Sequence, residues 1–97
     1  MSLILTFATI HDALAAEKAA RQSRGTAQGG EEELVPLPPQ VKSDCGFGLF
    51  IPAATRLEDT RIVALVKSGV EFTEAYRVYE SDMHDGQRKE KRYERID

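Results

Sequence analysis

The chain has 97 residues, of which 41% are hydrophobic and 30% are charged, and its formal net charge is -3. This length suits a single domain, because natural domains cluster at about 100–150 residues. The negative net charge lacks the excess of lysine and arginine that is typical of a nucleic-acid binder. The apolar run from Leu3 to Ile10 is far shorter than the ~20 residues of a membrane span. We therefore expect a cytoplasmic protein that binds neither nucleic acid nor membrane.

The chain contains one cysteine, Cys45. It cannot form an internal disulfide, whereas a secreted domain of this size usually carries several. The two histidines, His11 and His84, lie far apart and share no cluster with Cys45. This spacing does not match a metal site, so we expect none.

The first half of the chain predicts a strand, a helix and a loop. Residues 3–8 are almost wholly apolar, as in a central strand. Residues 10–24 have helical spacing and many alanines, and Thr9 suits the N-cap. Three glycines then predict a loop over residues 25–32. We attribute the acidic run Glu31-Glu32-Glu33 to solvation of this loop.

Two short strands are predicted in the middle of the chain. Residues 33–38 are apolar and carry Pro36 and Pro38, which remove N–H donors from one side of a strand. Such a strand belongs at the edge of a sheet. Residues 47–51 alternate with a period of two, and Pro52 ends the pattern.

The second half predicts a helix, a strand and a tail. The spacing of Thr55 and Glu58 matches a capping box, and Gly69 suits the end of the helix that follows. Residues 70–79 alternate as in a strand that begins late, near Thr73. The charged residues 81–97 contain little apolar surface, which predicts a disordered tail or a frayed helix.

This order of elements, β-α-β-β-α-β, predicts an α+β fold. We expect a ferredoxin-like sandwich over residues 1–80, with a four-stranded antiparallel sheet in the order 4-1-3-2 and two helices on one face. The proline-bearing strand then lies at an edge. The same topology places Cys45 close to the residues that begin the first helix, Thr9, Ile10, His11 and Asp12.

Cys45 is the candidate for chemistry, because it lies in a glycine-flanked bend between two apolar segments. A thiol attacks as the thiolate, and an ordinary cysteine with a pKa of ~8.5 is mostly protonated at neutral pH. A helix N-terminus and Lys42 would favour the charged form. Gly46 and Gly48 would leave room for a reagent, and His11 is a candidate base. The alternative is a buried, unreactive cysteine.

Several motifs resemble the selenium/sulfur carrier protein-like family of short bacterial proteins. They are Thr6-Phe7, Thr9, the run His11-Asp12-Ala13-Leu14-Ala15-Ala16-Glu17-Lys18, the run Leu34-Val35-Pro36-Leu37-Pro38, and Ser43-Asp44-Cys45-Gly46. The resemblance spans about residues 3–79. It implies that Cys45 carries sulfur or selenium as a persulfide or selenopersulfide. The chain departs from the family pattern in its long connection from Gln22 to Glu32 and in Gln40 after the prolines, where Lys42 is the nearest basic residue.

We therefore expect a carrier without organic cofactor or metal, which exchanges sulfur or selenium with donor and acceptor proteins. Cys45 is the carrier thiol, supported by Lys42, Ser43, Gly46, Thr9 and His11. The pattern leaves homo-oligomerisation open. A second interpretation is a non-catalytic interaction or regulatory module, because a fold does not determine a function. A thiol reductase is disfavoured, since the chain has no second cysteine to resolve an intermediate.

Overall fold

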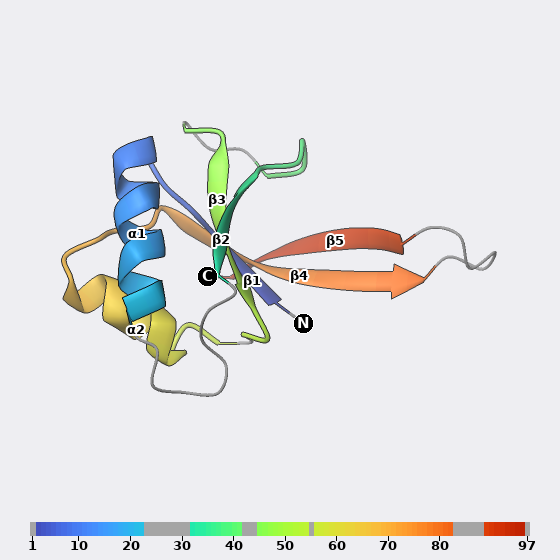
Figure 1. Ribbon diagram of the computed structural model, residues 1–97. Coiled ribbons are helices and arrows are strands. Elements are labelled where there is room, and N and C mark those ends of the chain that lie inside the picture. The colour runs from blue at the N-terminus through green and yellow to red at the C-terminus, as the bar shows by residue number, and fades with distance from the viewer. Residues whose placement is uncertain (1, 23–31, 42–44, 55, 83–88, 97) are drawn as a thin grey trace.

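The structure is a computed structural model that describes residues 2–22, 32–41, 45–54, 56–82 and 89–96. Two helices and five strands follow one another along the chain (Figure 1). They are β1 (Ser2–Thr6), α1 (Ile10–Gln22), β2 (Glu33–Pro36), β3 (Phe47–Pro52), α2 (Thr60–Lys67), β4 (Glu74–Asp82) and β5 (Lys89–Ile96). All strand pairs are antiparallel, and the sheet order is β2-β3-β1-β4-β5. The predicted α+β class is confirmed.

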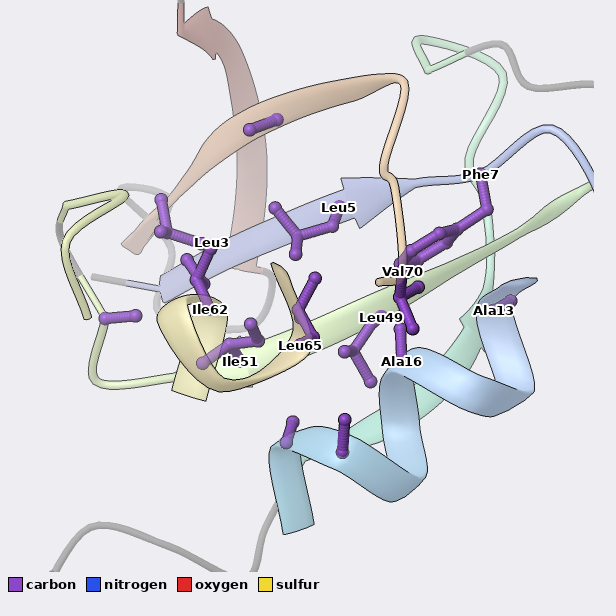
Figure 2. Close-up of a cluster of buried hydrophobic side chains, with 14 residues drawn as sticks. Leu3, Leu5, Phe7, Ala13, Ala16, Leu49, Ile51, Ile62, Leu65 and Val70 are labelled. Atoms are coloured by element: carbon purple, nitrogen blue, oxygen red, sulfur yellow. The ribbon is translucent and has the colours of Figure 1, made fainter. Parts of the chain in front are cut away.

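Both helices cover the same face of the sheet (Figure 1). Side chains alternate between the faces of a strand, so Leu3 and Leu5 of β1 point toward the helices, as Figure 2 shows. They meet side chains from β3 and α2 in a common core. Helix α1 contributes alanines, Ala13, Ala16, Ala19 and Ala20, all of them buried. Small side chains let this helix pack close to the sheet.

Helix α1 begins as the sequence predicts. The backbone N–H of Asp12 donates to Oγ1 of Thr9 at 3.1 Å, which is the N-cap hydrogen bond. The described part of the helix ends at Gln22. The predicted end near residue 24 lies outside the described residues.

Helix α2 begins later than the predicted capping box implies. Its N-cap is Asp59, whose Oδ1 accepts the backbone N–H of Arg61 at 2.9 Å. Thr55 lies outside the described residues, and residues 56–58 form a turn before the helix. The Asp59 carboxylate also accepts a hydrogen bond from Nε of the Arg61 side chain at 2.8 Å. The predicted end is confirmed, since Gly69 has φ +84° and the N–H of Val70 returns to the carbonyl of Leu65 at 3.1 Å.

The predicted four-stranded sheet is corrected to five strands. The expected order recurs as β2-β3-β1-β4, and the proline-bearing strand β2 lies at an edge as predicted. However, β4 runs to Asp82 and pairs with β5. The sheet thus continues past residue 80, where we expected the folded part to end.

The prediction of a disordered or helical tail is wrong for residues 89–96, which form β5. Charged side chains of this segment form cross-strand ion pairs while remaining accessible to solvent. Arg95 Nε lies 3.0 Å from Glu74 Oε2, and Arg77 Nη1 lies 3.5 Å from Glu94 Oε1. Opposite charges on neighbouring strands stabilise a pairing register. The rest of the predicted tail, residues 83–88 and 97, lies outside the described residues.

Candidate functional site

A compact bend joins β2 to β3 and carries the cysteine. The N–H of Leu37 donates to the carbonyl of Gly46 at 3.0 Å, and the N–H of Val41 donates to the carbonyl of Pro38 at 3.0 Å. The Val41 side chain is buried and anchors the bend. These contacts place Cys45 directly before β3, where the chain enters the sheet.

Cys45 is partly buried and packs against the hydrophobic core. Its Sγ donates a hydrogen bond to the carbonyl of Phe47 at 3.1 Å. The sulfur is therefore held at the border between core and solvent and is not sealed in the interior.

The two glycines beside Cys45 have different roles. Gly46 has φ +76°, which L side chains rarely adopt, and a Cβ there would meet open space. Gly48 is buried, and a Cβ there would lie 2.7 Å from Leu37 Cδ2 and 3.0 Å from the carbonyl oxygen of Leu5. The expectation that Gly48 leaves room for a reagent is wrong, because Leu37 occupies that space. Only Gly46 opens toward solvent.

The strand register places the cysteine at the end of the sheet where α1 begins. Gly48 of β3 pairs with Thr6, the last residue of β1, and α1 starts shortly afterwards at Ile10. The Thr6 hydroxyl lies 2.6 Å from Oγ1 of Thr73 and accepts the N–H of Glu74 at 3.1 Å. These hydrogen bonds hold β1 to β4 where β1 ends. The bend and the helix start lie at the same end of the sheet, as Figure 1 shows.

The predicted supporting residues have separate surroundings. Thr9 caps α1 with its hydroxyl. His11 is exposed on the first turn of α1, and its side chain makes no hydrogen bond or ion pair with the described residues. Its role as a base for Cys45 stays a prediction. Lys42 and Ser43 lie outside the described residues.

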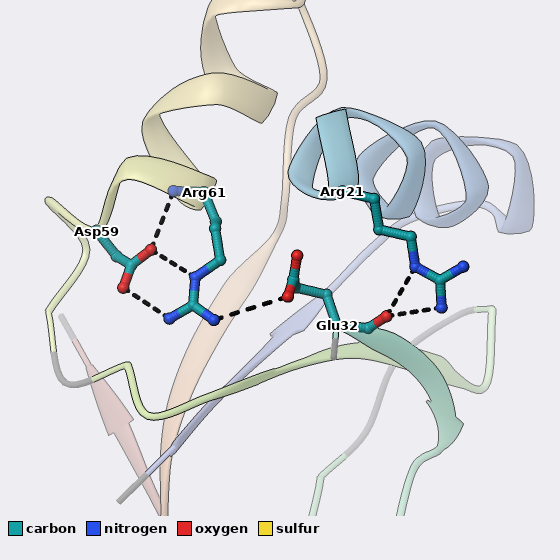
Figure 3. Close-up of polar contacts among 4 residues, drawn as sticks. All are labelled: Arg21, Glu32, Asp59 and Arg61. Carbon is teal, nitrogen blue, oxygen red and sulfur yellow. Dashed lines mark hydrogen bonds and ion pairs between the residues drawn. The ribbon is translucent and has the colours of Figure 1, made fainter. Parts of the chain in front are cut away.

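Sequence reasoning missed a cluster in which Arg61, Asp59 and Glu32 form a buried ionic core and the exposed Arg21 binds the Glu32 backbone (Figure 3). The Arg61 side chain is 1% exposed and the Glu32 side chain 0%. Arg61 donates to both carboxylate oxygens of Asp59, at 2.8 and 2.9 Å, and its Nη1 lies 3.8 Å from Glu32 Oε2. From α1, Arg21 donates through Nε and Nη2 to the carbonyl of Glu32, at 3.0 and 2.9 Å. The cluster joins the start of α2 to α1 and β2.

This cluster corrects the assignment of the whole acidic run to loop solvation, because Glu32 is fully buried. Glu33 is exposed, and Glu31 lies outside the described residues. A buried carboxylate requires an ionic or hydrogen-bonding partner. One signal in the sequence could have suggested the pairing of Asp59 with Arg61. Both residues lie at the start of a helix, where the side chain of the N-cap commonly binds groups of the first turn.

The electrostatics of the cluster follow from its hydrogen bonds. The Arg61 side chain lowers the pKa of Asp59 below its ordinary value of 3.8 by donating hydrogen bonds to the carboxylate, and burial opposes this effect. The same hydrogen bonds raise the pKa of Arg61. Both groups therefore remain charged at neutral pH, and the cluster holds structure together instead of supplying an acid or base.

Comparison with known proteins identifies one family. Residues 2–77 match the model of the family described as "Putative Se/S carrier protein-like". No curated protein and no solved structure matches the chain. Within the described residues, neither helix combines the length and apolar character that a membrane crossing requires.

Proposed function

Because the chain belongs to the Se/S carrier protein-like family, we propose that it carries a sulfur or selenium atom on Cys45 between a donor and an acceptor protein. The observation that supports this proposal is the position of the sulfur. Cys45 is the one cysteine in the sequence, and its thiol is partly exposed in a hydrogen-bonded bend. A carrier needs a thiol that a partner can reach and a scaffold that returns it to the same place.

The transfer is an exchange at sulfur. The Cys45 thiolate attacks the terminal sulfur of a donor persulfide, so that a bond forms between Sγ and that sulfur. The sulfur–sulfur bond of the donor breaks, and its electron pair leaves with the donor thiolate. Delivery repeats the step with an acceptor thiolate as nucleophile. No net oxidation or reduction occurs, and a selenium atom transfers in the same way.

The surroundings of Cys45 suit this exchange. Gly46 presents no side chain on the solvent side of the bend. The start of α1, at the same end of the sheet, carries the partial positive charge of a helix N-terminus, which favours anions such as a thiolate or persulfide. We assign supporting roles to Thr9, which caps that helix, and to His11, Lys42 and Ser43 as groups near the sulfur in sequence or topology. A reducing compartment such as the cytoplasm would keep the thiol available.

Loading with labelled sulfur tests the proposal. The protein is incubated with a cysteine desulfurase and ³⁵S-cysteine, and its intact mass is measured. We expect one added sulfur on the native protein, released by dithiothreitol, and none on Cys45→Ser. A parallel reaction with selenocysteine lyase and selenocysteine tests selenium. Absence of any adduct on the native protein, or an equal adduct on Cys45→Ser, would contradict the proposed carrier function.

A second measurement tests access to the sulfur. Cys45 is alkylated with iodoacetamide in the native protein and in urea, and the two rates are compared with that of glutathione. A native rate close to the unfolded rate supports a thiol open to partners. A native rate a hundredfold slower would indicate a masked cysteine and would favour the interaction module over the carrier.

A further inference from the structure

Three large apolar side chains are exposed on the elements that meet at the Cys45 end of the sheet. Ile10 and Leu14 lie on α1 and are 39% and 50% exposed, and Phe47 at the start of β3 is 40% exposed. We call these three residues the apolar patch. Exposed apolar side chains that lie together mark interaction surfaces, so the arrangement of the three decides whether this patch is one.

The flank of α1 that carries Leu14 lies along β2. Glu17 Oε2 accepts the N–H of Leu34 at 3.1 Å, and the next turn of α1 binds the residue before β2, so the helix and the strand run in opposite directions. Residues three or four apart lie on one face of a helix. Leu14 precedes Glu17 by one turn and therefore lies toward Pro36, the last residue of β2. Ile10 lies one turn nearer the bend.

Phe47 extends the patch from the helix to the cysteine. It pairs with Pro36 across β3 and β2. Side chains alternate along a strand, so Phe47 shares the helix-covered face of the sheet with the buried Leu49. The carbonyl of Phe47 accepts the hydrogen bond of the Cys45 thiol at 3.1 Å. The sulfur therefore adjoins the apolar patch, and a molecule that reaches the thiol also contacts this surface.

One exposed cation borders the patch. Lys18 follows Leu14 by one helical turn, is exposed, and forms no ion pair with the described residues. The next cation on this flank, Arg21, already pairs with Glu17 at 3.7 Å. Complementary charges align two proteins and speed their association. The surface that fits here is therefore apolar, with a carboxylate at its border opposite Lys18.

We propose that the apolar patch binds the sulfur donor, a persulfide-bearing protein whose contact surface is apolar with an acidic border. This inference rests on the proposed carrier function. The exchange brings the donor persulfide to Cys45 Sγ, so the donor covers the surface around Phe47 during transfer. A second copy of this chain is not the occupant, because exchange between identical thiols delivers no net sulfur.

Loading of the full chain from two donors tests this surface. One donor is a cysteine desulfurase that carries a ³⁵S persulfide, and the other is glutathione persulfide, which is too small to use the patch. Leu14→Asn should lower the rate constant of loading from the desulfurase about five- to tenfold, because a half-exposed leucine loses its contact. It should load from glutathione persulfide like the native chain. The matched control is Val66→Asn on α2, which is 53% exposed and should load normally from both donors.

Two further variants test the border and the strand side of the patch. Phe47→Ala should slow loading from the desulfurase by a factor similar to that of Leu14→Asn. Lys18→Glu should slow it about two- to threefold at low salt, and added salt should remove the difference, as for exposed charge pairs. An unchanged rate for Lys18→Glu would overturn the acidic border of the partner.

The outcomes separate docking from the carrier function. Equal slowing with both donors, or equal slowing in Leu14→Asn and Val66→Asn, would overturn the docking surface and leave the carrier function standing. Loading of the native chain by glutathione persulfide and not by the desulfurase would do the same. A dimer of the native chain that Leu14→Asn dissociates, measured by sedimentation, would assign the patch to a second copy. A native chain that neither donor loads would contradict the carrier function itself.

Discussion

The two ends of β2 lead into regions of opposite character. Before β2, Glu32 enters a cluster in which buried charges depend on one another for partners. After β2, the bend holds a partly exposed sulfur with a few backbone hydrogen bonds. The comparison shows that the protein buries the side chains of Glu32 and Arg61 as a structural ion pair and keeps Cys45, the proposed carrier thiol, at the surface of the core. We expect substitutions in the first region to lower the free energy of unfolding far more than substitutions in the second.

The largest effect is expected at Arg61. Arg61→Ala leaves the carboxylates of Asp59 and Glu32 buried without their cation, and removing one partner of a buried ion pair costs about 3–5 kcal/mol. Urea denaturation measures the lowered free energy of unfolding. The matched control is Val63→Ala, two residues further along α2, whose side chain is 38% exposed. Similar losses in the two variants would refute the structural role of the cluster.

Within the bend, Gly48 should be the more sensitive glycine. Gly48→Ala forces Cβ against Leu37 and the Leu5 carbonyl, and such overpacking costs about 1–3 kcal/mol. In Gly46→Ala the new Cβ contacts no other atom, so only the positive φ destabilises the protein, by about 1 kcal/mol. Thermal or urea unfolding of the two variants measures the difference. A more destabilised Gly46→Ala would show that backbone strain, and not packing, limits this bend.

Acid should weaken the cluster through Asp59. Its pKa is lower in the folded protein than the ordinary 3.8, so the unfolded chain binds the proton more readily. The resulting stabilisation is present above the unfolded pKa and is lost as the pH falls through the folded pKa. We expect the free energy of unfolding to fall more steeply between about pH 5 and pH 2 in the native protein than in Asp59→Asn. Identical pH profiles would show that Asp59 does not contribute.

The smallest effect is expected at the sulfur itself. Cys45→Ser retains a donor for the Phe47 carbonyl in a partly exposed position, so its unfolding free energy should change by less than about 1 kcal/mol. Urea denaturation measures this change in the free energy of unfolding. In the sulfur-loading assay the same variant should carry no added sulfur. A loss as large as that of Arg61→Ala would make Cys45 a packing residue and remove the contrast between the regions.

The local patterns predicted much of the fold. Periodicity and capping chemistry were sufficient to predict features that depend on neighbouring residues. These features are the apolar run of β1, the Thr9 cap, the alternation of β3 and the glycine after α2. The prolines of β2 also predicted its edge position correctly. The same reasoning failed for β5, because a segment of mixed charges is stabilised by cross-strand partners that lie outside its own sequence.

The candidate site divides in the same way. The sequence alone supplied Cys45 as the candidate nucleophile, since it is the one cysteine, and correctly predicted its position between two strands. The sequence did not indicate that Glu32 is buried, that Leu37 fills the space above Gly48, or that β5 forms the second edge of the sheet. Each of these depends on which distant segments meet, because burial and charge pairing are properties of the packed chain and not of its local pattern.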